Sequence, residues 1–236
     1  MQCWPSRCSP CWRAARSRPR HLVLVLGDQL DAKSTAFDGF DPQLDAVWMA
    51  EVAEESTHVW SSKPRTVMFL AAMRHFAQAL RAAGRPLHYT ALDAEGNRGS
   101  LQAQLESDIE RLRPAALVMT APGDWRVLQA IKAAAQAQGL PLDLREDRHF
   151  YCSVREFAAH ARGRKSLRME YFYREMRKRH NVLMGGEAGN EPEGGQWNFD
   201  ADNRESFGTA GPGAVPPRGV FMPDAITREV IALVEA

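Results

Sequence analysis

The feature that most constrains this chain is a short aliphatic run that stops at a glycine. Residues 22–26 read Leu-Val-Leu-Val-Leu, and Gly27-Asp28-Gln29-Leu30 follows directly. Five consecutive aliphatic side chains are few for a helix and are typical of a strand buried on both faces. Glycine permits a sharp turn, and open α/β sheets hold ligands beyond the carboxyl ends of their strands. We therefore expect Asp28 and Gln29 at a ligand-binding edge, with a plain strand-to-loop turn as the alternative.

Strand-like and helix-like segments alternate from residue 22 onward. Short apolar runs predict five strands, at residues 22–26, 46–50, 86–90, 115–120 and 140–144. Between them, apolar residues recur at helical spacing: Phe69, Met73, Phe76 and Leu80; Leu101, Leu105, Ile109 and Leu112; and Leu128, Ile131 and Ala135. Helices between consecutive strands require crossover connections and hence a mostly parallel sheet. The predicted fold class is α/β, a doubly wound, Rossmann-like domain with a five-stranded sheet over residues 21–148.

The pattern changes after this domain. Residues 149–181 predict a helical extension, with a short helix at 153–160 and a longer, basic one at 164–180. Residues 182–236 contain two loops rich in glycine and end in an amphipathic stretch with apolar Ile226, Val230, Ile231 and Val234. We expect this last part to be an interdomain linker and a truncated first helix of a further domain. Without that domain its apolar side chains would lack a partner, so we expect residues 182–236 to be poorly ordered.

The first twenty residues show no periodic pattern and no apolar core of a secretory signal. Cys3, Cys8 and Cys11 have the spacing of a plant-type iron–sulfur loop, but the remaining cysteine, Cys152, lies far along the sequence. We interpret residues 1–20 as a disordered or non-native extension. The small number of cysteines fits a reducing, cytoplasmic compartment, and no apolar run reaches the roughly 20 residues of a membrane span.

The predicted strand ends bring acidic residues to one edge of the sheet. Glu51 directly follows a buried strand and is the best single ligand-binding candidate, with a solvated acid at the start of a helix as the alternative. Asp124 follows another strand, but a helix cap is its better interpretation. The sequence has no glycine-rich dinucleotide motif and no phosphate-binding loop. An acidic edge without these motifs favours a neutral, hydroxyl- or amide-rich heterocycle over a phosphorylated ligand.

Other functional signals are weak. The basic helix predicted at residues 164–180 is compatible with a phosphate backbone. A solvated face over an apolar stripe, or an ion-paired domain interface, explains it better. The histidines show no metal-ligand spacing, and no nucleophile elbow is present. The net charge of +1 implies no partner. We predict no catalytic and no metal-binding residue in this chain.

Several longer motifs add a family resemblance. Residues 22–30 resemble the opening of the photolyase/cryptochrome-related proteins, and so do residues 72–76, 120–126, 163–177 and 195–204. Together they are similar to the bacterial iron–sulfur branch of that family, the prokaryotic (6-4) photolyases. The similarity extends from about residue 22 to the end of the chain, and its last two motifs are long and specific.

The resemblance implies part of a light-dependent DNA repair flavoprotein. In that family an N-terminal α/β domain holds an antenna chromophore, 6,7-dimethyl-8-ribityllumazine, and a helical domain holds FAD, a 4Fe-4S cluster and the damaged DNA. Gly27, Asp28, Gln29, Leu30 and Glu51 occupy positions that match the lumazine pocket. A carboxylate facing the polar edge of the lumazine ring is chemically reasonable because it can accept ring N–H hydrogen bonds.

The chain also departs from the family pattern, because the sites for FAD, the cluster and the lesion are not present in it. Cys3, Cys8 and Cys11 match no cluster ligand of the family. We therefore expect a monomer that binds the antenna chromophore and neither FAD nor a cluster, with weak DNA binding or none. The alternative is a free-standing chromophore-binding or interaction module without repair activity.

Overall fold

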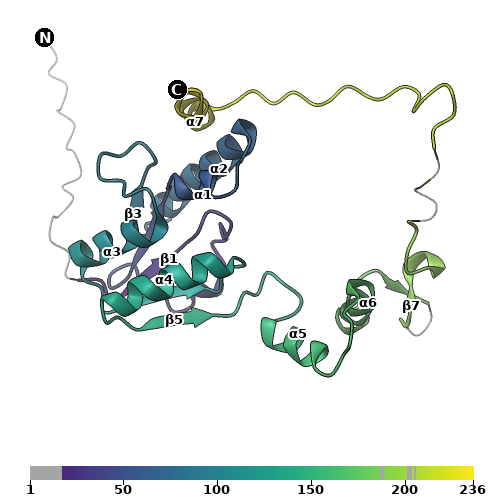
Figure 1. Ribbon diagram of the computed structural model, residues 1–236, viewed down its shortest axis with the longest axis horizontal. Coiled ribbons are helices and arrows are strands. Elements are labelled where there is room, and N and C mark those ends of the chain that lie inside the picture. The colour runs from purple at the N-terminus through teal and green to yellow at the C-terminus, as the bar shows by residue number, and fades with distance from the viewer. Residues whose placement is uncertain (1–17, 187–188, 201–203, 205) are drawn as a thin grey trace, which may run out of the picture. The chain divides into compact units, whose positions relative to one another are not determined.

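The computed structural model describes residues 18–186, 189–200, 204 and 206–236. It divides the chain into two compact units (Figure 1). Unit 1 runs to Arg145 and also contains residues 225–236, and unit 2 comprises residues 146–224. The predicted extension at residues 1–20, with Cys3, Cys8 and Cys11, lies almost wholly outside the described residues. Among the described residues, no helix has the length and apolar character needed to cross a membrane.

Unit 1 contains the predicted five-stranded parallel sheet. Its strand order is β3-β2-β1-β4-β5 and all neighbouring strands run parallel. The strands are β1 (His21–Leu24), β2 (Ala46–Ala50), β3 (Leu87–Thr90), β4 (Ala116–Thr120) and β5 (Leu142–Arg145). The doubly wound α/β prediction is confirmed, and β2 matches its predicted bounds. The other strands differ from their predicted bounds by one or two residues, because terminal apolar residues extend beyond the hydrogen-bonded ladder.

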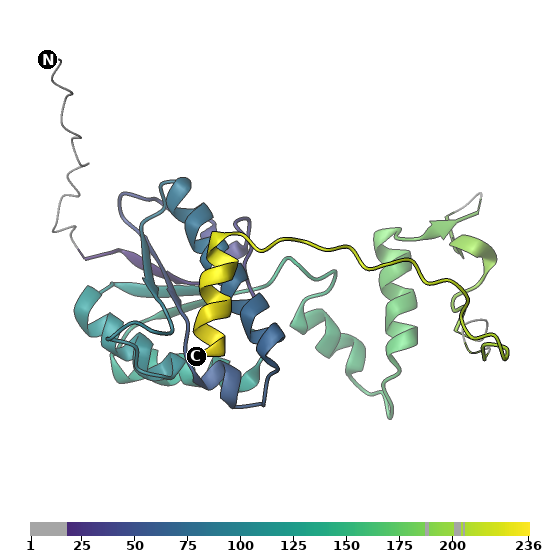
Figure 2. The same ribbon diagram turned by 90° about the horizontal axis from the view of Figure 1, so that it is seen from above.

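Alternate residues of the central strands pack on opposite faces of the sheet. Leu22, Leu24 and Trp48 pack with α3 (Leu101–Leu112) and α4 (Trp125–Ala137), which cover one face. Val23 and Val47 pack with α2 (Lys63–Ala82) on the other face. Both faces are therefore buried, which explains why these strands read as continuous apolar runs instead of alternating patterns. Figure 2 shows the sheet between the two helical layers.

The face that α2 covers is completed by a helix from the far end of the sequence. Helix α7 (Ala225–Glu235) packs against α2, and Figures 1 and 2 show the two helices side by side. Val230 is fully buried in the same apolar cluster as Val47, and Val234 packs at its edge. The Lys63 Nζ atom donates to the Glu235 carbonyl oxygen at 3.5 Å. The expectation that the apolar side chains of this helix lack a partner in the chain is therefore wrong.

The ends of the helices follow local sequence signals. The Asp124 carboxylate accepts from the Arg126 backbone N–H at 2.7 Å and caps α4, which confirms the predicted cap. The Ser100 side chain caps the start of α3 in the same way. Arg113, which follows the last residue of α3 and precedes Pro114, has a left-handed backbone conformation with φ of 52°. A short helix, α1 (Glu54–Thr57), and a 3-10 turn, η1 (Thr35–Phe37), were not predicted from the sequence. Both are too short to show an apolar period.

Unit 2 is built from short elements with few buried side chains. Among its described residues only Met176 and Arg177 are buried. Its elements are α5 (Val154–Ala161), α6 (Met169–His180), the antiparallel strands β6 (Met184–Gly185) and β7 (Glu191–Pro192), and a second 3-10 turn, η2 (Glu193–Gly195). Helix α6 begins five residues later than the helix predicted at residues 164–180. Residues 164–168 are not helical, because the chain turns at Gly163, which has a positive φ of 76°.

Candidate functional site

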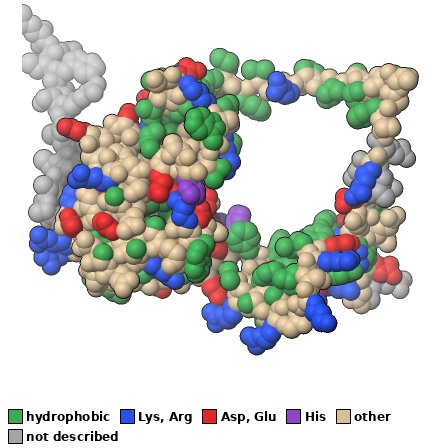
Figure 3. All heavy atoms as spheres, in the orientation of Figure 1, with side chains coloured by type: hydrophobic (Ala, Val, Ile, Leu, Met, Phe, Trp, Pro, Cys, Tyr) green, Lys and Arg blue, Asp and Glu red, His purple; other side chains and the backbone are tan. Residues whose placement is uncertain are grey.

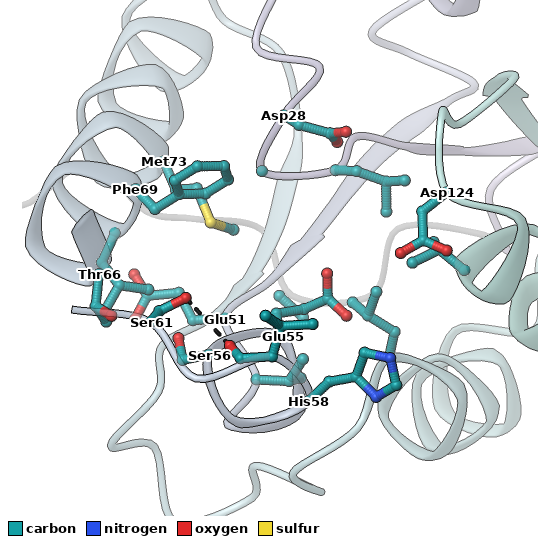
Figure 4. Close-up of a pocket in the computed structure, with 18 of the residues that line it drawn as sticks. Asp28, Glu51, Glu55, Ser56, His58, Ser61, Thr66, Phe69, Met73 and Asp124 are labelled. Carbon is teal, nitrogen blue, oxygen red and sulfur yellow. Dashed lines mark hydrogen bonds between the residues drawn. The ribbon is translucent and has the colours of Figure 1, made fainter. Parts of the chain in front are cut away.

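A cavity of about 330 Å³ lies in unit 1 at the carboxyl edge of the sheet (Figure 4). Residues that follow β1, β2 and β4 form its floor, and side chains of α2 form one wall. The segment that contains α1 and the start of α4 form the opposite side. The order of strands reverses between β1 and β4, so the cavity lies at the switch point where doubly wound sheets bind ligands.

Gly27 is required here by packing. Its φ is not among the positive values, so the backbone does not depend on glycine for its conformation. A Cβ atom at this position would lie 2.9 Å from the Met73 sulfur atom and 3.4 Å from a Phe69 ring carbon. The absence of a side chain lets α2 approach the end of β1 closely. Gly27 therefore sets the distance between the floor and one wall of the cavity.

Three carboxylates line the side of the cavity opposite α2. Asp28 follows β1 and is exposed, Glu55 belongs to α1, and Asp124 caps α4. Figure 4 shows that these three side chains come from separate elements. Arg126 also lines the cavity and binds two of them, with its Nη2 atom 2.8 Å from Glu55 and 3.4 Å from Asp124. Arg126 forms no hydrogen bond or ion pair with the third carboxylate, Asp28.

Hydrogen bonds and ion pairs shift the pKa values of Arg126 and Asp124. The hydrogen bond to Glu55 raises the pKa of Arg126, and the pairing with Asp124 and Glu54 acts in the same direction. The hydrogen bond from the Arg126 backbone N–H lowers the pKa of Asp124. Both groups are therefore charged at neutral pH. They tie the α1 segment to the start of α4 and fix this side of the cavity.

Glu51 forms part of the cavity wall, but its carboxylate is engaged on every side by protein groups. The Glu51 side chain is fully buried. Its Oε1 atom accepts from Arg74 Nε at 2.8 Å and from the Tyr89 hydroxyl, and its Oε2 atom accepts from Arg74 Nη2 at 2.9 Å and from the Leu92 N–H at 2.8 Å. We call Glu51, Arg74, Tyr89 and the Leu92 N–H the Glu51 cluster.

The charges of the Glu51 cluster compensate one another. The hydrogen bond to Glu51 raises the pKa of Arg74, so its guanidinium remains charged. Burial raises the pKa of Tyr89, and the hydrogen bond to Glu51 raises it further, so the phenol remains a neutral donor. Arg74 also lies 3.7 Å from the exposed carboxylate of Asp93. Because every acceptor position of the Glu51 carboxylate is occupied by a protein donor, Glu51 offers no free acceptor to the cavity.

The structure places the remaining two predicted site residues outside the lining of this cavity. The Gln29 Nε2 atom donates to the carbonyl oxygens of Thr120 and Ala121 at 3.3 and 3.0 Å, and so joins the segment after β1 to the end of β4. Leu30 packs against the apolar cluster on the α2 face. Of the five predicted residues, Gly27, Asp28 and Glu51 line the cavity, while Gln29 and Leu30 support the adjacent loop.

The remaining lining is apolar on two sides and carries hydroxyl groups near the start of α2. Phe69 and Met73 face the cavity from α2, with Leu26, Ala50, Val52 and Leu101 completing the apolar surface. Ser56, Ser61 and Thr66 lie around the other end, as Figure 4 shows. Phe69 was predicted on the buried stripe of its helix, yet 37% of it is exposed. An exposed aromatic ring at a cavity wall provides a surface for stacking a planar ligand.

Sequence reasoning missed Arg74, Arg126 and Glu55. Arg74 had a usable signal, because it is a single cation among apolar residues of α2: Leu70, Ala71, Met73 and Ala77 are all buried. A charge at such a position needs a buried partner. Arg126 and Glu55 carried no comparable signal, since each follows a strand end by several residues and their pairing depends on how the two loops meet.

Comparison with known proteins agrees with this architecture. A family model described as deoxyribodipyrimidine photo-lyase-related protein matches residues 23–236. The chain belongs to this family. It is also 45% identical, over 215 residues, to a protein named (6-4) photolyase from Agrobacterium fabrum. That alignment covers 91% of this chain and 41% of the Agrobacterium protein, so the chain spans about two fifths of the length of this relative.

Proposed function

We propose that unit 1 is the antenna domain of a photolyase-related protein and that its cavity binds 6,7-dimethyl-8-ribityllumazine. The observation that carries this proposal is the cavity at the β1/β4 switch point, which combines apolar walls, an exposed aromatic ring and a set of carboxylates. Its position is that of ligand sites in doubly wound sheets. The chain's membership of the photolyase-related family supports the same assignment.

The size and chemistry of the cavity suit a compact ribityl heterocycle. A volume of about 330 Å³ lies at the lower end of the range for small-molecule sites. It would accommodate a two-ring heterocycle with a short polyol better than a dinucleotide such as FAD. Asp28 can accept ring N–H hydrogen bonds, Phe69 and Met73 can cover a ring face, and Ser61 and Thr66 can bond polyol hydroxyls. Bound lumazine would supply light absorption, and these residues would hold and orient it.

The acidic side of the cavity disfavours phosphorylated ligands. Asp28, Glu55 and Asp124 all line it, and the nearby Arg126 is already bound to Glu55 and Asp124. A phosphate group placed there would meet like charges at short range, which is unfavourable. The neutral polyol of a lumazine avoids this repulsion.

For the longer protein, we propose a light-dependent DNA repair function. The similarity to a protein named (6-4) photolyase supports it. In that interpretation FAD, a 4Fe-4S cluster and damaged DNA belong to parts of the protein beyond this chain. We further propose that the protein is cytoplasmic and monomeric.

One observation favours the alternative, a chromophore-binding module that acts without repair. Helix α7 completes the apolar face of unit 1, so both faces of the sheet are covered by residues of this chain. A photorepair assay on the longer protein, and not on this chain alone, separates the two functions. After illumination with an oligonucleotide that contains a (6-4) photoproduct, the repair interpretation expects repaired product, and the module interpretation expects chromophore binding without it.

The proposal is tested by titrating the full chain with 6,7-dimethyl-8-ribityllumazine and following its fluorescence. We expect binding at one site per chain. Asp28→Asn should weaken it by about ten- to a hundredfold, because one hydrogen bond to a charged group is worth on the order of 1.5–3 kcal/mol. Glu95→Gln is the control, because Glu95 is an exposed acid outside the cavity. No binding by the wild-type chain, or equal losses in the two variants, would contradict the proposal.

A further inference from the structure

We infer that Glu51 is a positioning residue of the chromophore site, which acts through Arg74 and Tyr89 and does not contact the ligand. This inference rests on the proposed function. Its basis is the geometry of the Glu51 cluster, in which a fully buried carboxylate receives four hydrogen bonds. An ionised carboxylate has about four acceptor positions, so a ligand N–H could reach Glu51 only by displacing one of these partners.

The partners of Glu51 belong to three different segments around it: α2, β3 and the loop that follows β3. Arg74 follows Met73 on α2, the helix that presents Phe69, Leu70 and Met73 to the cavity. Tyr89 belongs to β3, the neighbour of β2 in the sheet. The two Arg74 bonds form a bidentate pair, which fixes direction as well as distance. Glu51 therefore holds α2 against the sheet at the height of the cavity.

The third partner, the Leu92 N–H, anchors the loop between β3 and α3. Asn97 in this loop donates through Nδ2 to the Glu51 carbonyl oxygen at 2.6 Å and to the Ala91 carbonyl oxygen at 2.8 Å. The Glu54 N–H then donates to the Gly99 carbonyl oxygen at 3.0 Å, which joins the loop to the start of α1. Leu101 and Glu55, which line the cavity, lie two residues after Gly99 and one residue after Glu54. One carboxylate thus connects α2, β3 and the loop before α3.

The two acids at the sheet edge consequently have different roles. Asp28 is exposed to the cavity and forms no hydrogen bond with a described residue. By contrast, every acceptor position of the Glu51 carboxylate is occupied. Removing the Glu51 charge should loosen the cavity walls and weaken binding while leaving the chemical environment of the bound ring unchanged. Removing the Asp28 charge should alter that environment directly.

The experiment uses the full chain, with 6,7-dimethyl-8-ribityllumazine as the probe. Dissociation constants and the absorption spectrum of the bound probe are measured for Glu51→Gln, Tyr89→Phe, the double variant, Asp28→Asn and the control Glu95→Gln. Circular dichroism at the titration temperature shows that each variant is folded. Tyr89→Phe removes a single hydroxyl, so it remains informative if Glu51→Gln does not fold.

We expect Glu51→Gln to weaken binding on the order of tenfold and Tyr89→Phe about threefold, with the double variant no weaker than Glu51→Gln alone. The spectrum of the bound probe should remain that of the wild type in all three and shift only in Asp28→Asn. A spectral shift in Glu51→Gln would show direct contact with the ring and overturn the inference. A double variant whose loss is the product of the single losses would show that Glu51 and Tyr89 act independently, and would overturn it too. Unchanged affinity in both single variants would also overturn it. A wild-type chain that does not bind the probe would instead refute the proposed function, and the positioning role with it.

Discussion

The two units of this protein are stabilised in different ways. Unit 1 buries its sheet on both faces, and Trp48, Leu105 and Ile131 are among its fully buried side chains. The described residues of unit 2 include almost no buried apolar side chains. Many of its large hydrophobic side chains are exposed, as Figure 3 shows on its visible face. Its contacts are mostly between charged and aromatic groups at its surface. Apolar burial contributes far more stability per residue than exposed polar contacts, so we expect unit 1 to be the stable part of the chain.

Trp197 illustrates how unit 2 is held together. The cationic groups of Arg174, Arg177 and Lys178, all on α6, lie 5.3 to 5.4 Å from the centre of its ring. Arg177 also donates to the carbonyl oxygens of Val182 and Leu183, just after the end of α6. From the sequence, the basic face of α6 was interpreted as solvated or ion-paired. Part of this face instead packs on the Trp197 ring, about twenty residues later in the sequence.

The largest expected effect concerns α7, the helix that unit 1 receives from the end of the sequence. Val230→Asp would place an unpaired carboxylate at a fully buried position and should destabilise unit 1 by about 2–4 kcal/mol. Ala232→Asp introduces the same charge at an exposed position of α7 and should have little effect. Urea denaturation followed by near-ultraviolet circular dichroism measures the difference. Equal midpoints for the two variants would mean that α7 does not contribute to the core.

A smaller effect is expected from a buried polar group beneath the sheet. Asp108 accepts hydrogen bonds from the Trp48 indole N–H and from Gln104, both at 2.9 Å, and pairs with Arg111. Burial alone would raise the pKa of Asp108, but these hydrogen bonds outweigh it and hold the pKa below its ordinary value of 3.8. The folded state therefore favours the carboxylate, and its contribution is complete above pH 3.8 and lost as the pH falls through the lowered pKa.

Asp108→Asn should consequently cost about 1–2 kcal/mol at neutral pH, with a smaller difference from the wild type in strong acid. Denaturation curves between about pH 2.5 and 7 test this dependence, because that range extends about one pH unit or more to either side of the ordinary pKa of an aspartate. Glu110→Gln, an exposed position on the same helix, is the control. A cost for Asp108→Asn that is constant with pH would show that the carboxylate charge is not the stabilising feature.

The smallest effect is expected in unit 2. Trp197→Ala removes the ring that contacts three cations, and each such exposed contact is worth roughly 0.5–1 kcal/mol. Amide hydrogen exchange should become faster in α6 and stay unchanged in the strands of unit 1. Trp60→Ala removes a ring that is 92% exposed and serves as the matched control. Faster exchange in β1 or β4 on loss of Trp197 would show that the two units are not independent.

The sequence predicted the sheet well because its strands are short, aliphatic and separated by clear helices. Residues 46–50 could be assigned without knowledge of their neighbours, because a strand buried on both faces is apolar at every position. The docking of α7 could not be predicted, because its partner helix lies about 150 residues earlier and an amphipathic pattern does not specify what covers it. The same pattern fits a helix that packs on another domain.

The candidate site shows a similar limit. Gly27, Asp28 and Glu51 could be placed at the sheet edge because each directly follows an apolar strand. The difference between an available carboxylate and an engaged one could not be seen, because it depends on Arg74 and Tyr89, which approach Glu51 from other elements. Position along a strand predicts where a side chain lies, whereas its partners depend on tertiary packing.

The most direct test of the central claim is hydrogen exchange of the full chain with and without 6,7-dimethyl-8-ribityllumazine. We expect slower exchange on binding in the segments that line the cavity of unit 1, namely residues 26–28, 51–73 and 122–127. We expect no change in α5 and α6 of unit 2. Protection confined to unit 2, or no protection at a saturating concentration of lumazine, would show that the cavity of unit 1 is not the lumazine site.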